Sequence, residues 1–456
     1  MVISNTEKKM RAKRTYLLSS GEHYAILHYF KDKRVVELDR GHRRFLQAEE
    51  VLTWDELERR RDRDALYVLD SDSYSEKIVA LKEKGYRTYG GELTNLERDR
   101  IACMEVFEKA GIDVPDWEYA ETYDELIEKL ERIRFEKVVV KGDTKVPKWG
   151  TLSGTRDKVM KVLEDNRELW ENSKDWIIQE FVEGYEISCE VYFKDGVWDE
   201  SLTNWTLETK NLLSGGVRTG GESNLIIPYG MINEKLGKVM EETLKLASVV
   251  NVRDALYDIN FIVRGNRAYA LEITPRIGYP GTITFAHLLM HNGFHYDEAL
   301  KSDMRGEKIV GFGFGVKLTL PPYPFLDYQD LDKLFESIEE EEKEEKEKKK
   351  ELLGILKSIP YLKGVKIDVE EIDDMLGEER SRVAWDGVWL SAEGRLGEIS
   401  SDELGILNTF DLDFSEAINT AYNKEIKMLQ EYIPLLQFKD IDENLVERIK
   451  YFLLDD

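Results

Sequence analysis

The stretch YALEITPRIGYPG, residues 269–281, joins an apolar strand pattern to a polar end. Residues 267–273 (RAYALEI) are mostly apolar and alternate as a buried β-strand does. Glu272, Thr274 and Arg276 then follow at every second position, just before a Pro-Gly break. Because alternate residues of a strand share a face, the pattern predicts an acid, a hydroxyl and a base side by side at one strand end.

Asp258 supplies a second acid near this strand end. It closes ALYD, the start of the strand pattern ALYDINFIV at residues 255–263. Two carboxylates on neighbouring strands can bracket a hard cation, and Mg²⁺ (or Mn²⁺) prefers such oxygens together with water and nucleotide phosphates. Arg276 carries a planar, permanent positive charge that suits a phosphate oxygen. We therefore expect Asp258 and Glu272 to hold a metal and Arg276 to contact a phosphoryl group.

Length and composition limit the class of protein. A chain of 456 residues predicts about two to four domains. Hydrophobic residues make up 42% of the chain and aromatic residues 11%. This content is sufficient to build hydrophobic cores. The net charge of −26 argues against a general nucleic-acid or membrane-surface binder, because both partners are polyanionic. A net negative charge is compatible with a local basic pocket. Apart from that, it indicates only that the protein is soluble.

Cysteine use and apolar runs indicate a cytoplasmic protein with no membrane partner. Cys103 and Cys189 stand far apart, outside any metal-ligand spacing, so no structural disulfide is expected. The basic N-terminus is followed by no apolar signal-peptide core. The longest uncharged run, residues 277–296, is interrupted by glycine, proline and histidine and makes a poor membrane span.

The chain divides into three blocks, and the fold class expected is α/β within an α+β multidomain chain. Residues 1–95 alternate strand and helix patterns, which predicts an N-terminal domain with an open parallel sheet. Its clearest unit is residues 65–85, a buried strand, a polar turn and an amphipathic helix ending in glycine. The further blocks are residues 96–300 and a smaller C-terminal domain, residues 301–456. In the last block, the mixed-charge run 335–359 predicts a solvent-exposed helix, to which we assign no catalytic or binding role.

Two features upstream of the acids are suited to a nucleotide. Lys141 closes the apolar strand KVVVK and carries a positive charge out of the sheet, although a surface lysine of this kind also occurs without a ligand. The segment IIQEFVEGYEIS resembles a hinge, with Glu180 and Glu186 on either side. Backbone groups there, at Val182, can hydrogen-bond an adenine edge, and a carboxylate can accept both ribose hydroxyls. An exposed acidic turn is the alternative.

Two further patterns are candidates for sites. The loop NLLSGGVRTGGESN places glycines around Arg218, which would let backbone N–H groups approach an anion, or the loop is only a connector. His287, His291 and His295 are spaced by four, but Gly293 is expected to end the helix before the third histidine. With no cysteine or motif carboxylate nearby, these histidines are weak evidence for a metal site.

The order of these pieces resembles the ATP-grasp superfamily, and within it the phosphoribosylamine–glycine ligase family. The pieces are a helix with Asp99-Arg100, the strand-end Lys141, a polar loop, QEFVEGYE, and Asp258 followed by LEITPR. The likeness covers most of the chain and is strongest between residues 65 and 282. It implies an ATP-grasp fold in residues 96–300, with a small lid subdomain at about 115–185 and a catalytic subdomain at about 186–300.

The resemblance also implies a set of residue roles. ATP would be bound by Arg100, Lys141, Glu180, Val182 and Glu186. The metal would be held by Asp258, Glu272 and Thr274. The catalytic residues would be Arg276 at the phosphoryl group and Arg218 at the carboxylate or acyl phosphate.

The chain departs from the family pattern in its substrate half. Thr274 stands where the family has asparagine, and a hydroxyl binds Mg²⁺ more weakly than an amide carbonyl. LDSDSYS replaces a loop with glycine and proline by acids, and Asp70 and Asp72 would repel a sugar phosphate. We therefore expect an ATP-dependent ligase that joins a small-molecule carboxylate to an amine. The alternatives are phosphoribosylamine–glycine ligase itself, of purine biosynthesis, and a nucleotide-binding relative that has lost ligation.

Overall fold

The structure is a computed structural model, and it describes most of the chain between residues 13 and 454. The described residues are 13–21, 24–38, 45–70, 74–91, 93–142, 151–165, 167–171, 173–211, 218–320, 366–376, 381–386, 388–390, 397–399, 403–433, 436, 438 and 443–454. The charged run 335–359 and the segment 144–150 lie outside this range.

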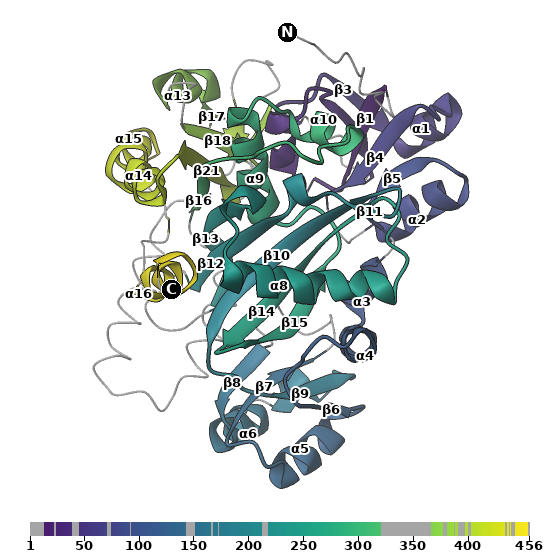
Figure 1. Ribbon diagram of the computed structural model, residues 1–456, viewed down its shortest axis with the longest axis vertical. Coiled ribbons are helices and arrows are strands. Elements are labelled where there is room, and N and C mark those ends of the chain that lie inside the picture. Colours follow the sequence, from purple (N-terminus) through teal and green to yellow (C-terminus); the bar gives the residue numbers. More distant parts are fainter. Residues whose placement is uncertain are drawn as a thin grey trace.

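The first region is a five-stranded sheet at the top of Figure 1. Its order is β3-β2-β1-β4-β5, and every pair is parallel, as the strand-helix alternation predicted. The strands are β1 (Arg14–Ser19), β2 (Arg34–Glu37), β3 (Glu50–Thr53), β4 (Ala65–Leu69) and β5 (Arg87–Tyr89). The short helix η1 (Tyr24–Tyr29) and the helices α1 (Trp54–Arg60) and α2 (Ser75–Glu83) connect them. Helix α2 has Tyr74 at its N-cap position, without a side-chain hydrogen bond.

Two helices lead out of this sheet. Helix α3 (Thr94–Arg98) ends at Asp99, whose side chain accepts a hydrogen bond from the Ala102 N–H and so caps α4 (Arg100–Ala110). Gly111, in the left-handed conformation with φ of 72°, ends α4 as the sequence predicted.

A four-stranded antiparallel sheet, here called the lid sheet, follows at the bottom of Figure 1. Its order is β6-β9-β7-β8, with the helices α5, α6 and α7 packed on its own small core. The elements are β6 (Trp117–Ala120), α5 (Tyr123–Arg132), β7 (Lys137–Lys141), β8 (Thr151–Thr155), α6 (Arg156–Asp165), α7 (Arg167–Trp170) and β9 (Trp176–Glu180).

The largest sheet has nine strands and lies at the centre of the molecule (Figure 1). Its order is β15-β14-β10-β12-β13-β16-β21-β18, with β11 paired to β10, and its pairs are antiparallel. The strands are β10 (Tyr185–Lys194), β11 (Val197–Trp198), β12 (Asn204–Asn211), β13 (Arg218–Pro228), β14 (Ala255–Arg264), β15 (Arg267–Thr274), β16 (Phe312–Thr319), β18 (Ser381–Trp385) and β21 (Glu403–Asp411). The helices among them are η2 (Glu200–Leu202), η3 (Tyr229–Met231), α8 (Glu234–Lys245), η4 (Leu246–Ser248), α9 (Gly281–His291) and α10 (Tyr296–Lys301).

The two faces of this sheet differ in composition. One face is apolar and packs on α4 and α8; Ile187, Cys189 and Ile259 are among its buried members. On the other face an apolar cluster lies beside α9 and η1, and polar residues take the remaining alternate positions of the same strands. The candidate site lies on this second face, which we call the polar face.

The C-terminal block shares the central sheet. The expected domain boundary at residue 300 falls before β16, which is hydrogen-bonded to β13 across that boundary. The remaining elements are β17 (Lys366–Ile367), α13 (Val369–Leu376), β19 (Val388–Leu390), β20 (Gly397–Ile399), α14 (Phe414–Thr420), η5 (Ala421–Glu425), α15 (Ile426–Tyr432), α16 (Glu443–Ile449) and η6 (Lys450–Leu454). The division into three domains stays a prediction.

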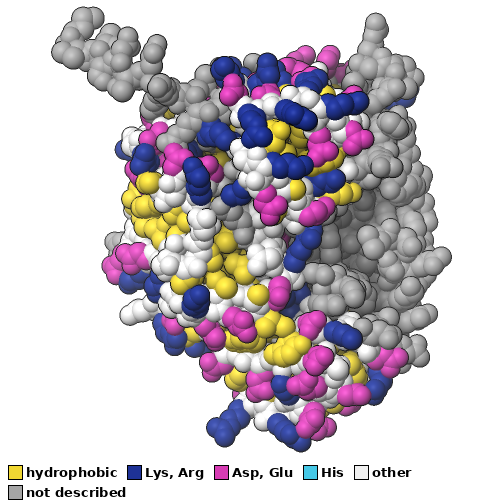
Figure 2. All heavy atoms as spheres, turned by 90° about the vertical axis from the view of Figure 1, so that its right-hand side faces the viewer, with side chains coloured by type: hydrophobic (Ala, Val, Ile, Leu, Met, Phe, Trp, Pro, Cys, Tyr) yellow, Lys and Arg dark blue, Asp and Glu magenta, His cyan; other side chains and the backbone are white. Residues whose placement is uncertain are grey.

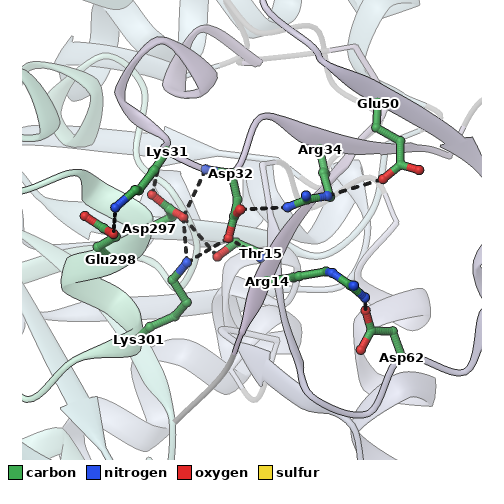
Figure 3. A network of polar contacts seen from close by, with 10 residues as sticks. All are labelled: Arg14, Thr15, Lys31, Asp32, Arg34, Glu50, Asp62, Asp297, Glu298 and Lys301. Carbon is green, nitrogen blue, oxygen red and sulfur yellow. Dashed lines mark hydrogen bonds and ion pairs between the residues drawn. The ribbon is translucent and has the colours of Figure 1, made fainter. Parts of the chain in front are cut away.

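A buried polar network joins the N-terminal sheet to α10 (Figure 3). The Asp297 carboxylate, fully buried, accepts from the Lys301 ammonium at 2.9 Å and from the Thr15 hydroxyl at 3.2 Å. Lys301 also pairs with Asp32 at 2.9 Å, and Asp32 pairs with Arg34 at 2.6 Å. These contacts fix the N-terminal sheet against the region that carries the site.

The surface carries charges of both signs. Figure 2 shows Lys and Arg side chains interspersed with Asp and Glu over the N-terminal sheet and over the lid sheet, so the net negative charge is not gathered in one patch on that face. None of the helices in the described ranges is both long and apolar enough to cross a membrane. Cys103 and Cys189 are both buried and are not joined to each other by a disulfide.

Candidate functional site

Strands β14 and β15 bring the predicted metal ligands together on the polar face. Their antiparallel register places Asp258 opposite Thr274 and Asn260 opposite Glu272. All four side chains are half-buried, whereas Ile259 and Ile273 between them point into the apolar core. Two carboxylates, a hydroxyl and an amide therefore share one partly accessible strip of the sheet.

Asn260 is a candidate site residue that the sequence analysis missed. Its Nδ2 donates to the Glu272 carboxylate at 3.1 Å, which orients that carboxylate. The signal was present in the sequence, because Asn260 is the next residue on the same strand face after Asp258. In the described part of the chain no group of three His, Cys, Asp or Glu side chains is arranged so that it could hold a metal ion by itself. The candidate ligands are thus a mixed set of hard oxygen donors, which suits Mg²⁺ rather than a softer metal.

Lys141 and Glu272 act on the same buried thiol. The pKa of Cys103 is raised to about 12, mainly by burial; the Glu272 carboxylate contributes to the rise, and the Lys141 ammonium opposes it. Both charged groups therefore lie in the neighbourhood of this α4 side chain.

Arg100 lies at the start of α4, beside the end of β7. Its guanidinium donates a hydrogen bond to the backbone carbonyl of Gly142, the residue after Lys141. Arg100 thus holds the end of the lid strand, and a guanidinium with five donors can contact a second acceptor as well.

The predicted hinge connects the lid sheet to the central sheet. Glu180 ends β9, and its backbone N–H donates to the Asp116 carbonyl at 2.8 Å. Val182 is buried, with 6% of its surface exposed. At Gly184 an added Cβ would lie 2.4 Å from the Val263 carbonyl oxygen, so the hinge requires glycine to approach β14 this closely.

Beyond the hinge, β10 adds further acids to the polar face. Glu186 is half-buried opposite Ile262, and Ser188 lies opposite Asn260. Glu186 therefore lies on the same face of the sheet as the metal strip.

Arg276 is held by contacts that the sequence analysis did not predict. Its Nη2 pairs with the Glu97 carboxylate of α3 at 2.6 Å, and its Nη1 donates to the Ile277 carbonyl at 2.9 Å. The side chain is only 16% exposed, and its Nε has no partner among the described residues. Glu97 fixes the guanidinium, and one buried donor remains for a ligand.

Glu190 anchors the turn that follows Arg276. It is 4% exposed, opposite Asp258 in β14, and it accepts from Asn204 at 3.1 Å and from the Thr282 hydroxyl at 2.6 Å. The Thr282 hydroxyl in turn accepts from the Gly278 N–H at 2.7 Å. Burial raises the pKa of Glu190 above its ordinary value. This network ties the start of α9 to the polar face.

Other candidates from the sequence are placed as follows. Arg218 begins β13, opposite Asn211, but its side chain and the loop 212–217 lie outside the described residues, so its role stays a prediction. His287 and His291 contact each other at 3.2 Å between their Nε2 atoms, and α9 ends before His295, which is the N-cap residue of α10. The three histidines do not come together as a cluster.

Comparisons with known proteins agree with this arrangement. The family model described as ATP-grasp domain matches residues 98–280. The C-terminal section of the carbamoyl phosphate synthase large chain from Aquifex aeolicus is 24% identical over 248 residues, which is 50% of this chain and 43% of that protein. Tyramine–L-glutamate ligase from Methanocaldococcus jannaschii is 27% identical over 143 residues, 30% of this chain and 42% of that protein. The chain thus matches less than half the length of these curated relatives.

Solved structures show the same architecture at low sequence identity. Phosphoribosylamine–glycine ligase from Thermotoga maritima has a TM-score of 0.63 and 19% identity, covering 93% of this chain and 97% of its own. The biotin carboxylase domain of Hydrogenobacter thermophilus 2-oxoglutarate carboxylase has a TM-score of 0.61 and 11% identity, covering 96% and 93%. The chain therefore has the ATP-grasp fold, and residues 98–280 form its ATP-grasp domain.

Proposed function

We propose that this protein is an ATP-dependent carboxylate–amine ligase that works through an acyl phosphate and releases ADP and phosphate. The observation that carries the proposal is the strip formed by Asp258, Thr274, Asn260 and Glu272, in register on the polar face. Lys141 ends β7 of the lid sheet, and the Arg100 guanidinium donates to the carbonyl of the next residue, Gly142, so two positively charged side chains at this strand end support a nucleotide site there.

The residues of the strip fit a divalent cation. Asp258 and Glu272 provide anionic oxygens, and Thr274 and the Asn260 carbonyl provide neutral ones, which is the donor chemistry of Mg²⁺ (or Mn²⁺). When bound there, Mg²⁺ would neutralise phosphate charge and polarise the transferred phosphoryl group. The ion would bind together with ATP rather than in a closed protein cage.

The residues around the strip have distinct proposed roles. Lys141 and Arg100 bind the phosphates of ATP, the hinge at Glu180 and Val182 binds the adenine edge, and Glu186 binds the ribose. Arg276 donates from its remaining nitrogen to the transferred phosphoryl group, held in place by Glu97. Arg218 contacts the carboxylate or the acyl phosphate.

The reaction proceeds in two steps, phosphorylation of the carboxylate and attack of the amine on the acyl phosphate. An oxygen of the substrate carboxylate attacks the terminal phosphorus of ATP, and the bond to ADP breaks. The amine nitrogen then attacks the acyl carbon, phosphate leaves with the bridging oxygen, and the nitrogen loses a proton. The protein accelerates both steps by positioning the partners and neutralising charge.

A second candidate is phosphoribosylamine–glycine ligase, an enzyme of purine biosynthesis. The structural likeness to the Thermotoga maritima ligase supports it. The fully buried Asp70, just past the end of β4 in the N-terminal sheet, opposes it, because an acid there disfavours a sugar phosphate. The third candidate, a nucleotide-binding relative without ligase activity, is supported by Thr274 in place of an amide ligand.

ADP release with added substrates tests the proposal. Pairs of carboxylates and amines are offered with MgATP, and we expect release that requires both partners. Glycine with phosphoribosylamine is one such pair and tests the second candidate directly. ATP binding without any substrate-dependent ADP release across the panel would favour the non-ligating relative and overturn the proposal.

A further inference from the structure

Residues 443–454, which form α16 and η6, pack against the strand that leaves the hinge. The Tyr451 ring stacks on the ring of Tyr185, the first residue of β10, with 4.4 Å between the ring centres and 21° between the ring planes. The Arg448 side chain is 3% exposed, and its Nη1 donates a long hydrogen bond of 3.5 Å to the Glu186 carbonyl. The segment therefore contacts two consecutive residues directly after the hinge.

The same segment also reaches the strand beside β10. The Tyr451 hydroxyl donates to the Gly265 carbonyl at 3.2 Å, in the turn between β14 and β15. Val263 of β14 lies opposite Tyr185, and its carbonyl oxygen is the atom that a Cβ at Gly184 would meet. Tyr451 therefore contacts both strands that lie next to the hinge glycine.

The segment is itself attached to the start of α8. The Asn233 Nδ2 donates to the Phe452 carbonyl at 2.6 Å, and the Lys235 Nζ donates to the Tyr451 carbonyl at 2.7 Å. The Lys235 ammonium also lies 4.4 Å from the centre of the Tyr451 ring, which is the geometry of a cation–π contact. Phe452 is fully buried. These contacts fix the Tyr451 ring in place independently of its contact with β10.

The hinge end of β10 has fewer strand contacts than its middle. The pairing of β10 with β14 runs from Tyr185 to Phe193, whereas its pairing with β12 runs only from Ser188 to Glu190. Within the described residues, the hinge end is thus hydrogen-bonded to a strand on its β14 side alone. Arg448 supplies a donor to the Glu186 carbonyl from outside the sheet. The helical segment thereby supports the part of β10 that the sheet supports least.

Side-chain alternation connects these contacts to the candidate nucleotide site. Tyr185 packs with the apolar face, where it meets Tyr451, whereas Glu186 lies on the polar face. A carboxylate that accepts from two ribose hydroxyls requires a fixed backbone, because hydrogen bonds weaken steeply as their geometry departs from the optimum. We propose that Arg448 and Tyr451 are positioning residues that hold the backbone of Tyr185 and Glu186, so that the protein selects nucleotides with a ribose 2′-hydroxyl. This inference rests on the proposed function, in which Glu186 binds the ribose of ATP.

Nucleotide binding by the whole chain tests this inference without any ligase substrate. Calorimetry measures the Kd for ADP and for 2′-deoxy-ADP in the presence of Mg²⁺, and the ratio of the two reports the contact to the 2′-hydroxyl. The wild type should bind ADP about tenfold more tightly, because the missing hydroxyl removes a hydrogen bond to a charged group. In Tyr451→Ala and in Arg448→Met the ratio should fall to about two or less, since Glu186 is no longer held. A loss of fold stability by itself leaves the ratio unchanged.

A conservative variant separates the stacked ring from its hydroxyl. Tyr451→Phe keeps the stack on Tyr185 and loses only the hydrogen bond to Gly265, so it should keep most of the preference for ADP. The double variant Tyr185→Ala with Tyr451→Ala should reduce the ratio no further than Tyr451→Ala does, because both changes remove the same stack.

Phe414→Ala is the matched control. Phe414 of α14 is partly buried, as Tyr451 is, and packs edge-on against Phe312 of β16 with 5.7 Å between the ring centres. In the sheet order β16 is three strands from β10. Phe414→Ala should lower the thermal midpoint, as Tyr451→Ala does, and leave both Kd values and their ratio unchanged.

The outcomes separate this inference from the function on which it rests. A wild-type ratio in a folded variant of Arg448 or of Tyr451, or an equal loss of selectivity in Phe414→Ala, overturns the positioning role and leaves the nucleotide site standing. Tyr451 is only partly buried, so the test does not depend on the folding of the Arg448 variant. Equal affinity of the wild type for ADP and 2′-deoxy-ADP overturns the assignment of Glu186 to the ribose, and the positioning role falls with it.

Discussion

The two faces of the nine-stranded sheet carry opposite kinds of side chain although the same strands build both. In β10 the buried Cys189 and Val191 point into the apolar core, whereas Glu190 between them lies on the polar face. In β14, Ile259 likewise points into the apolar core and Asp258 lies on the polar face. The apolar face contributes most of the packing that stabilises the sheet. The polar face carries the candidate site.

The difference is informative because burying polar groups opposes folding. Glu190, Asn224 and Lys317 are each less than 5% exposed. Burying apolar side chains at these positions would cost less free energy of folding than burying polar ones. A sheet that needed only stability would have two apolar faces under α8 and α9. Away from the contact of Tyr451 with Tyr185, substitutions on the apolar face should therefore change stability, and substitutions on the polar face should change binding and turnover.

The largest effect is expected at Glu272. Glu272→Ala should abolish ADP release with little change in thermal midpoint, because it removes an anionic ligand rather than a packing group. Its neighbour Ile273, 2% exposed on the apolar face, is the control. Ile273→Val should cost about 1 kcal/mol of stability and leave turnover of the folded protein unchanged. Equal loss of activity in both variants would mean that the faces do not divide these roles.

A smaller effect is expected at Lys141. Lys141→Met keeps the aliphatic chain but removes the charge, and it should raise the Kd for ATP by about tenfold or more, because a charge-assisted hydrogen bond is worth about 1.5–3 kcal/mol. Lys137 at the other end of β7 pairs with the exposed Glu183 and serves as control. Calorimetry that gives wild-type ATP affinity for Lys141→Met would remove this lysine from the nucleotide site.

A change of a few-fold is expected at Thr274. Thr274→Asn should lower the Mg²⁺ concentration needed for half-maximal ADP release, because an amide carbonyl binds Mg²⁺ better than a hydroxyl. Thr274→Val, without any donor oxygen, should raise it. The measurement is a Mg²⁺ titration at saturating ATP, and the same Mg²⁺ requirement in all three proteins would place the metal away from this strand end.

The smallest effect is a pH dependence of stability that arises on the polar face. Burial raises the pKa of Glu190 in the folded protein, so the folded state holds this proton more tightly than the unfolded state does. Its contribution to the free energy of unfolding should therefore be most favourable at acidic pH. It is lost as the pH rises from the unfolded pKa of about 4.3 through the raised folded value.

Thermal unfolding across this pH range distinguishes the faces. Glu190→Gln should lose stability relative to the wild type mainly at acidic pH and recover relative stability toward neutral pH. Val191→Ala, on the apolar face of the same strand, should be destabilised by the same amount at every pH. Parallel pH profiles for the wild type and Glu190→Gln would contradict the assignment.

The sequence alone determined the elements and the order of the site residues. Strand periodicity placed Asp258 on one strand and Glu272 and Thr274 on the next, and the structure has these strands as β14 and β15. The parallel N-terminal sheet and the end of α4 at Gly111 also followed from local pattern. These features depend on side-chain alternation and backbone preference, which act within a few residues and can be read along the chain.

Only the tertiary structure decided which distant residues share the site. The pairing of Arg276 with Glu97, the hydrogen bond from Asn260 to Glu272 and the stacking of Tyr451 on Tyr185 depend on strand register and on helix placement. Register arises from the packing of a whole sheet against its core, and a shift by one residue would exchange the two faces. For that reason the strand pattern could name the acids at the end of β15, but it could not say which residues across the sheet would lie beside them.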